Sequence, residues 1–110
     1  MELTTTIKML HDAAKRLDAG SKKVFELARG KAEAERIYRS ALAQVIFRMR
    51  DEKIPIGIIN DLARGEVADL KFERDLAAET YKASLSSLEA LKVEVSAIQT
   101  IVRWQSEVDS

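Results

Sequence analysis

The chain has 110 residues, of which 46% are hydrophobic and 33% charged, and its formal net charge is zero. This balance is typical of a folded chain, and we expect a single helical domain spanning residues 1–110. The lack of cysteine excludes a disulfide framework, a thiolate metal site and a thiol nucleophile. No apolar run approaches the roughly 20 residues that cross a bilayer, and the first residues do not resemble a secretion signal. The sequence therefore predicts a cytoplasmic protein without membrane contact.

The first predicted element is a helical arm over about residues 3–52. Apolar side chains recur there at alternating intervals of three and four, which places them on one face of a helix. The positions on this face are Leu3, Ile7, Leu10, Ala14, Leu17, Ser21, Val24, Ala28, Lys31, Glu35, Tyr38, Leu42, Val45 and Met49. The frame continues through Gly20, which we interpret as a kink or a tolerated residue. The alternative is a break near Gly20, with Ser21 capping a new helix, which would give a three-helix bundle.

The second predicted element is a connection over residues 53–65. Pro55 cannot continue a helix without losing a hydrogen bond, and a glycine such as Gly65 commonly follows a helix end. These residues therefore bracket the connection. The apolar residues between them have the spacing of a short helix: Ile56, Ile59 and Leu62.

The third predicted element is a helical arm over about residues 66–107, which contains neither glycine nor proline. Its seam positions are Val67, Leu70, Arg74, Ala77, Tyr81, Ser84, Leu88, Leu91, Val95, Ile98 and Val102. Polar residues at seam positions fix register and oligomeric state while they lower stability. We expect this role for Lys31, Glu35, Arg74 and Ser84.

Two such seams around a short helical connection predict an all-α fold, a long antiparallel helical hairpin that resembles a coiled coil. We expect the chain to fold back at residue 59 or 60, so that the numbers of facing seam residues sum to 119. In this register Met49 meets Leu70, and Tyr38 meets Tyr81.

The charges are distributed unevenly between the two arms. Residues 22–53 carry nine basic and five acidic side chains, whereas residues 66–110 carry five basic and nine acidic ones. Opposite charges favour the pairing of the arms, although each exposed ion pair contributes only about 0–1 kcal/mol. They do not create a field that would attract nucleic-acid phosphate.

A second apolar stripe on the C-terminal arm lies away from the predicted seam. An isolated two-helix hairpin buries little surface, and a row of small residues lets another helix approach closely. We therefore predict a homo-oligomer, most simply a dimer that forms a four-helix bundle. The alternative is that the alanines are surface helix formers without a partner. The candidate oligomer interface consists of Phe72, Leu76, Ala83, Ala90, Val93, Ala97 and Trp104.

The sequence lacks the residue patterns of metal or covalent catalysis. His11 is the single histidine, which excludes the paired histidines of zinc proteases and di-iron bundles. Helical nucleotide pyrophosphohydrolases hold magnesium with two acidic pairs, and only Glu66 with Asp69 has such a spacing. No base accompanies a serine nucleophile, and no glycine-rich phosphate loop occurs. We expect a protein that is not an enzyme and has no catalytic residue, cofactor or metal site.

The connection is a candidate surface for a protein partner, because loops that join rigid elements often carry recognition. The candidate residues are Ile58, Asn60 and Arg64. Nucleic-acid binding through a helix-turn-helix arrangement is the alternative, in which nearby basic residues would contact phosphates. Five acidic residues surround the basic ones, which argues against nucleic-acid binding. The basic residues are Arg48, Arg50, Lys53 and Arg64.

Four stretches of the chain follow a pattern found in a group of phage proteins. They are AERIYRSAL at 34–42, IPIGIINDLARG at 54–65, FERD at 72–75 and AETYK at 78–82. With them, residues 30–105 resemble small all-helical proteins encoded by tailed phages and prophages of Gram-positive bacteria. The resemblance implies a bacterial host cytoplasm and a phage or host protein as partner, but no assigned activity and no functional residues. We expect a non-catalytic protein that acts through self-association and protein–protein interaction, and the alternative is a nucleic-acid-associated accessory or regulatory protein.

Overall fold

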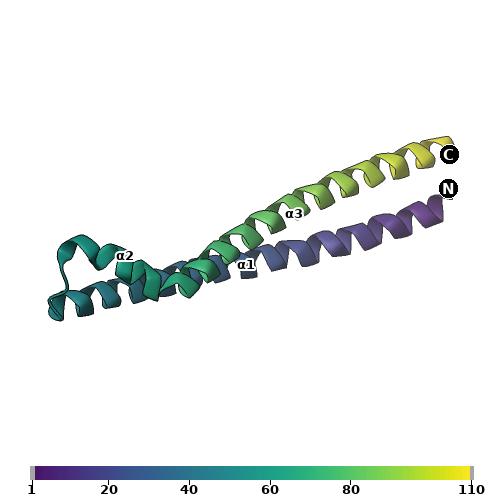
Figure 1. The fold of residues 1–110 in the computed structure, drawn as a ribbon. Helices are drawn as coiled ribbons and strands as arrows, with labels where there is room; N and C mark the ends of the chain where they lie inside the picture. Colours follow the sequence, from purple (N-terminus) through teal and green to yellow (C-terminus); the bar gives the residue numbers. More distant parts are fainter. Residues whose placement is uncertain (1, 110) are drawn as a thin grey trace. The chain divides into compact units, whose positions relative to one another are not determined.

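The computed structural model describes residues 2–109, and these form three α-helices and no strand. Helix α1 spans Leu3–Asp51, α2 spans Ile56–Glu66 and α3 spans Ala68–Asp109 (Figure 1). The chain divides into two compact units: unit 1 consists of Met1–Glu26 and Lys82–Ser110, and unit 2 of Leu27–Tyr81. Within residues 2–109, no helix combines the length and the apolar character that crossing a membrane requires. The predicted all-helical fold is confirmed.

Unit 1 pairs the N-terminal part of α1 with the C-terminal part of α3 (Figure 1). Gly20 lies inside α1, so the alternative of a helix break at this residue is wrong. A Cβ atom at Gly20 would lie 3.4 Å from Cδ1 of Leu88 and of Leu91. Two leucines of α3 therefore pack beside Gly20 at a distance that still admits a methyl group.

In unit 1 one of the two predicted seam positions per heptad is displaced by one residue, whereas Leu10, Leu17 and Val24 are partly buried as predicted. Thr6 and Ala13 are buried, whereas Ile7 is 49% exposed and Ala14 is exposed. The predicted seam follows a strict seven-residue repeat, whereas a straight α-helix drifts by about 20° per heptad from such a repeat. The assignment of Ile7 and Ala14 to the seam is therefore wrong.

Unit 2 contains the chain reversal, which occurs at residues 52–55 before α2 begins. The amide of Lys53 donates to the carbonyl of Arg50 at 3.1 Å, and that of Ile54 donates to the carbonyl of Met49 at 3.0 Å. Lys53 has a φ of 61°, which a non-glycine residue rarely adopts. Pro55 precedes the first residue of α2. A tight turn and a proline thus end α1 and start α2 within four residues.

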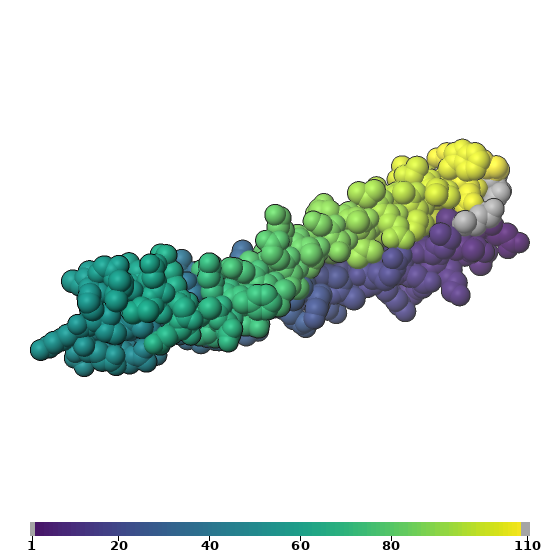
Figure 2. Space-filling view, in the orientation of Figure 1, coloured from purple at the N-terminus to yellow at the C-terminus, as the bar shows by residue number. Residues whose placement is uncertain are grey.

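Helix α2 packs back against the last turns of α1, and the atoms of the two segments are in contact at this end of unit 2 (Figure 2). Met49 of α1 and Ile59 and Ala63 of α2 form the buried cluster. Gly65 lies inside α2 instead of ending it, and the helix ends at the buried Val67. Four partly buried residues surround the cluster: Leu42, Val45, Ile46 and Ile54.

The register of unit 2 differs from the predicted one by one heptad. Tyr38 contacts Arg74, and Lys31 lies over Tyr81, so facing residue numbers sum to 112 instead of 119. The predicted pairing of Tyr38 with Tyr81 is therefore wrong, as is a fold-back at residue 59 or 60. Both registers keep the same seam positions, because they differ by seven residues. The tight turn, the packing of α2 and the contact of Arg74 with Tyr38 favour the observed register.

Candidate interaction surfaces

A polar cluster on the seam of unit 2 joins α1 to α3. The Cζ atom of Arg74 lies 4.4 Å from the ring centroid of Tyr38, and its Nε lies 3.6 Å from Oε2 of Glu35. Its side chain is only 26% exposed. The hydrogen bond to Asp75 is the main cause of a raised pKa of the Arg74 guanidinium, and the charges of Asp75 and Glu35 add to it. Arg74 is thus a permanent cation held over a buried aromatic ring.

The other polar seam residues are arranged differently from the expectation. The ammonium group of Lys31 lies 5.3 Å from the ring centroid of Tyr81. Lys31 is exposed, and Glu35 is hydrogen-bonded to Arg39 at 2.5 Å. Two of the four predicted register-setting residues, Lys31 and Arg74, therefore place cations over tyrosine rings across the hairpin, which the spacing of charges alone could not indicate.

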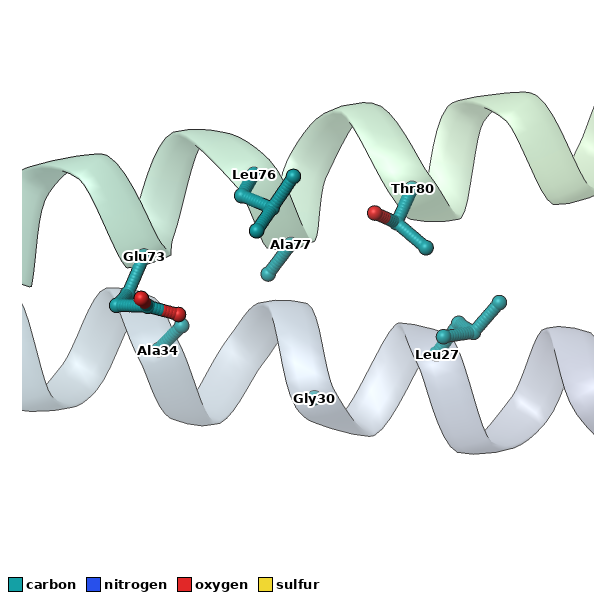
Figure 3. A pocket seen from close by; sticks show the side chains of 7 residues that line it. All are labelled: Leu27, Gly30, Ala34, Glu73, Leu76, Ala77 and Thr80. Atoms are coloured by element: carbon teal, nitrogen blue, oxygen red, sulfur yellow. The ribbon is translucent and has the colours of Figure 1, made fainter.

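A groove, here called the α1–α3 groove, lies beside this cluster in unit 2 (Figure 3). Its volume is about 320 Å³. Glu73 and Ala34 lie at one end and Leu27 and Thr80 at the other (Figure 3). A Cβ atom at Gly30 would meet no atom within 4 Å. The groove exists because small residues occupy positions where larger ones would fill the space: Gly30, Ala34 and Ala77.

Sequence reasoning missed the α1–α3 groove. It lies on the side of the seam, and its walls come from segments about 45 residues apart. Small residues of α1 and α3 that face one another could have indicated the groove. Recognising that they face one another requires the correct register. Leu76 was predicted for the oligomer interface, and it is the one member of that set that lines the groove.

The seven candidate interface residues on α3 are all exposed within the chain. Phe72 is 63% exposed and Leu76 49%, and both belong to unit 2. In unit 1, Val93 is 69% exposed and Trp104 is 64% exposed. None of the seven contributes to the buried core of its unit. The remaining members, all exposed and in unit 1, are Ala83, Ala90 and Ala97.

The three candidate partner-binding residues lie on a helix and not in a loop. Ile58, Asn60 and Arg64 are exposed residues of α2, and Ile58 is 49% exposed. The neighbouring Ile59 and Ala63 are buried. The predicted surface is thus the outer face of an amphipathic helix whose inner face is anchored in unit 2.

The basic residues near α2 are partly neutralised. The guanidinium of Arg48 donates to both carboxylate oxygens of Glu66, at 2.5 and 2.7 Å, and lies 3.6 Å from Glu52. Arg48 is therefore engaged within the chain, which weakens the nucleic-acid alternative. Glu66 belongs to α2 and Asp69 to α3, so this acidic pair does not share one helix face. No group of three or more potential metal-ligating residues gathers anywhere in residues 2–109.

Comparison with known proteins identifies no relative. No protein-family model, curated protein or solved structure matches the chain. Its function therefore has to be argued from its own surfaces.

Proposed function

We propose that this protein is a non-catalytic helical protein that acts by self-association and by binding another protein. The observation that carries the proposal is the distribution of apolar side chains. Among the described residues, fifteen large hydrophobic side chains are exposed, whereas seven hydrophobic residues, two of them alanines, are buried. Single exposed hydrophobic residues are ordinary, but such an excess is typical of a surface that another chain covers.

The exposed area supports the same proposal. The chain exposes 8210 Å². A compact monomer of 12.3 kDa is expected to expose about 6100 Å². The difference is larger than the roughly 800 Å² that each partner buries in a protein interface of ordinary size. Association of copies would bury part of this excess.

The exposed face of α3 is the proposed interface of a dimer. Replacing Val93 and Trp104 together by alanine is expected to weaken self-association at least about tenfold, since burying each side chain is worth on the order of 1.5–3 kcal/mol. Ile56→Ala is the matched control, because Ile56 is 83% exposed but lies on α2. Sedimentation velocity measures the association, and circular dichroism verifies that helix content is unchanged. Equal dissociation constants for wild type and the double variant would refute this interface.

The outer face of α2 is the proposed surface for a protein of the phage or its bacterial host, met in the host cytoplasm. This rests on the exposure of Ile58, Asn60 and Arg64 and on the resemblance to phage proteins. A tagged chain is expected to capture a defined partner from phage-infected or lysogenic cells. The triple alanine variant at these positions is expected to lose it. Retention of the same partner by the variant would exclude this face.

A further inference from the structure

We propose that the α1–α3 groove of one copy accepts Phe25 of a second copy, in a contact separate from the α3 interface. The inference rests on the proposed self-association and specifies a second contact. It follows from the groove, from one exposed aromatic residue and from the charges around both.

The groove has the properties of an acceptor for an apolar side chain. Glu73 is the single charged residue among those that line it, and Leu27, Leu76 and Ala77 contribute apolar walls (Figure 3). Its volume of about 320 Å³ exceeds the roughly 150 Å³ of an engineered apolar cavity that binds benzene. A phenyl ring therefore fits with room for part of its helix.

Phe25 has the properties of the inserted side chain. It is 76% exposed on α1, within unit 1. It cannot enter the groove of its own chain, because Phe25 and Gly30 are five residues apart on one continuous helix. Five residues correspond to a rotation of about 140° around the helix axis. The groove that accepts Phe25 must therefore belong to another copy.

The charges of the two surfaces are complementary. Lys22 lies one turn from Phe25 on α1, and Lys15 lies two turns before Lys22 on the same flank of the helix. Glu73 lines the groove and Asp69 lies one turn before it on α3, and neither makes an ion pair within residues 2–109. Lys22 pairs with Asp18 at 3.2 Å, but both side chains are at least 70% exposed, so the pair rearranges at little cost.

The same charges argue against a symmetric use of the groove. Phe72 lies one turn from Leu76 and is the nearest exposed aromatic residue on α3. If each copy inserted Phe72 into the groove of the other, Asp69 and Glu73 of both copies would approach one another. Like charges in an interface oppose association. Lys22, one turn from Phe25, carries the opposite charge to Glu73 and has no such conflict.

This geometry orients the second copy. A contact between Lys22 and Glu73 requires the donor α1 to run parallel to the acceptor α3, since each charge lies three residues, about 4.5 Å, before Phe25 and Leu76 respectively. Because the donor and acceptor surfaces differ, the contact is heterologous. Each copy keeps a free groove or a free Phe25, so assembly closes into a ring or continues beyond a dimer.

Two variants isolate the two halves of the contact. Phe25→Ala removes the inserted ring, and Gly30→Leu fills the groove with a side chain whose Cβ meets no other atom. Each variant alone is expected to associate at least about tenfold more weakly than wild type in sedimentation velocity. Phe47→Ala and Gly65→Leu are matched controls, since Phe47 is 75% exposed and a Cβ at Gly65 also meets no atom. Both controls are expected to associate like wild type.

Mixing the variants gives the decisive result. Phe25→Ala retains an open groove and Gly30→Leu retains Phe25, so the mixture is expected to associate at least about tenfold more tightly than either variant alone. Glu73→Lys and Lys22→Glu are expected to weaken association singly and to restore it when combined in one chain. The groove contact alone would be overturned if the wild type is oligomeric but Phe25→Ala or Gly30→Leu associates as tightly as wild type. It would also be overturned if the mixture associates no more tightly than either variant alone. A wild type that stays monomeric at every concentration would overturn the proposed function as well.

Discussion

Arg74 and Tyr38 illustrate how single side chains select a pairing that the apolar pattern leaves open. The contact between the Arg74 guanidinium and the Tyr38 ring spans the hairpin, and Glu35 approaches the same guanidinium from α1. Arginine over an aromatic ring contributes about 0.5–2 kcal/mol, depending on desolvation. A shift of the pairing between α1 and α3 by one heptad would remove this contact but would keep most apolar pairs. The polar cluster therefore contributes more to the choice of register than to total stability.

Arg74→Met is expected to change the free energy of unfolding by no more than about 1 kcal/mol, since methionine still covers the ring and partly exposed ion pairs contribute little. Urea denaturation measures the change. Asp75→Asn is a suitable control, because it removes the neighbouring carboxylate without touching the ring contact. A loss above about 3 kcal/mol would mean that Arg74 is an essential buried partner.

Gly20→Ala is expected to stabilise the protein by about 0.5–1 kcal/mol, because alanine has the higher helix propensity. The new Cβ would reach ordinary van der Waals contact with Leu88 and Leu91, at 3.4 Å. Gly30→Ala is the comparison, since its Cβ meets no atom. Thermal denaturation of both variants provides the measurement. Destabilisation by Gly20→Ala alone would show that the two helices approach too closely for a methyl group.

At the scale of elements, the heptad pattern of the sequence was sufficient to predict the long helices. The arm predicted for residues 3–52 is α1, Leu3–Asp51, and the arm predicted for 66–107 is α3, Ala68–Asp109. A continuous helix was predicted through Gly20, because the apolar spacing continues on both sides of this residue. The short helix expected around Ile59 is α2, which extends to Glu66.

The sequence could not determine how these elements pair. Registers that differ by seven residues use the same seam positions, so periodicity cannot separate them. Gly65 suggested a helix end, yet it is helical, and the reversal occurs at Lys53 instead. The drift of the seam towards Thr6 and Ala13 accumulates with helix length, so a frame fixed near Tyr38 fails most at the N-terminal end.

The packing of α2 leads to a test at the same scale. Ile59 is 3% exposed, whereas the adjacent Ile58 is 49% exposed. Ile59→Ala is expected to cost about 2–4 kcal/mol, as deletion of a buried isoleucine side chain leaves a cavity beside Met49. Ile58→Ala is the matched control and is expected to change stability by no more than about 0.5 kcal/mol. Equal effects of the two changes in urea denaturation would show that α2 does not cover α1 in solution.

At the scale of the whole molecule, the sequence was sufficient to predict only some of the candidate interaction surfaces. The seven residues proposed for the α3 interface could be selected from spacing, because an exposed stripe follows directly from helix periodicity. The α1–α3 groove could not, since its walls meet only in the observed register. Exposure of Ile58, Asn60 and Arg64 was foreseen, but their place on a helix anchored by Ile59 was not.

We propose that other copies of the chain cover its exposed apolar surface. Sedimentation equilibrium over a range of micromolar concentrations tests it most directly, because it reports mass without reference to shape. We expect an average mass that rises with concentration to at least twice 12.3 kDa. We also expect that Val93→Ala with Trp104→Ala lowers this mass. A single species of 12.3 kDa at every concentration would contradict this proposal.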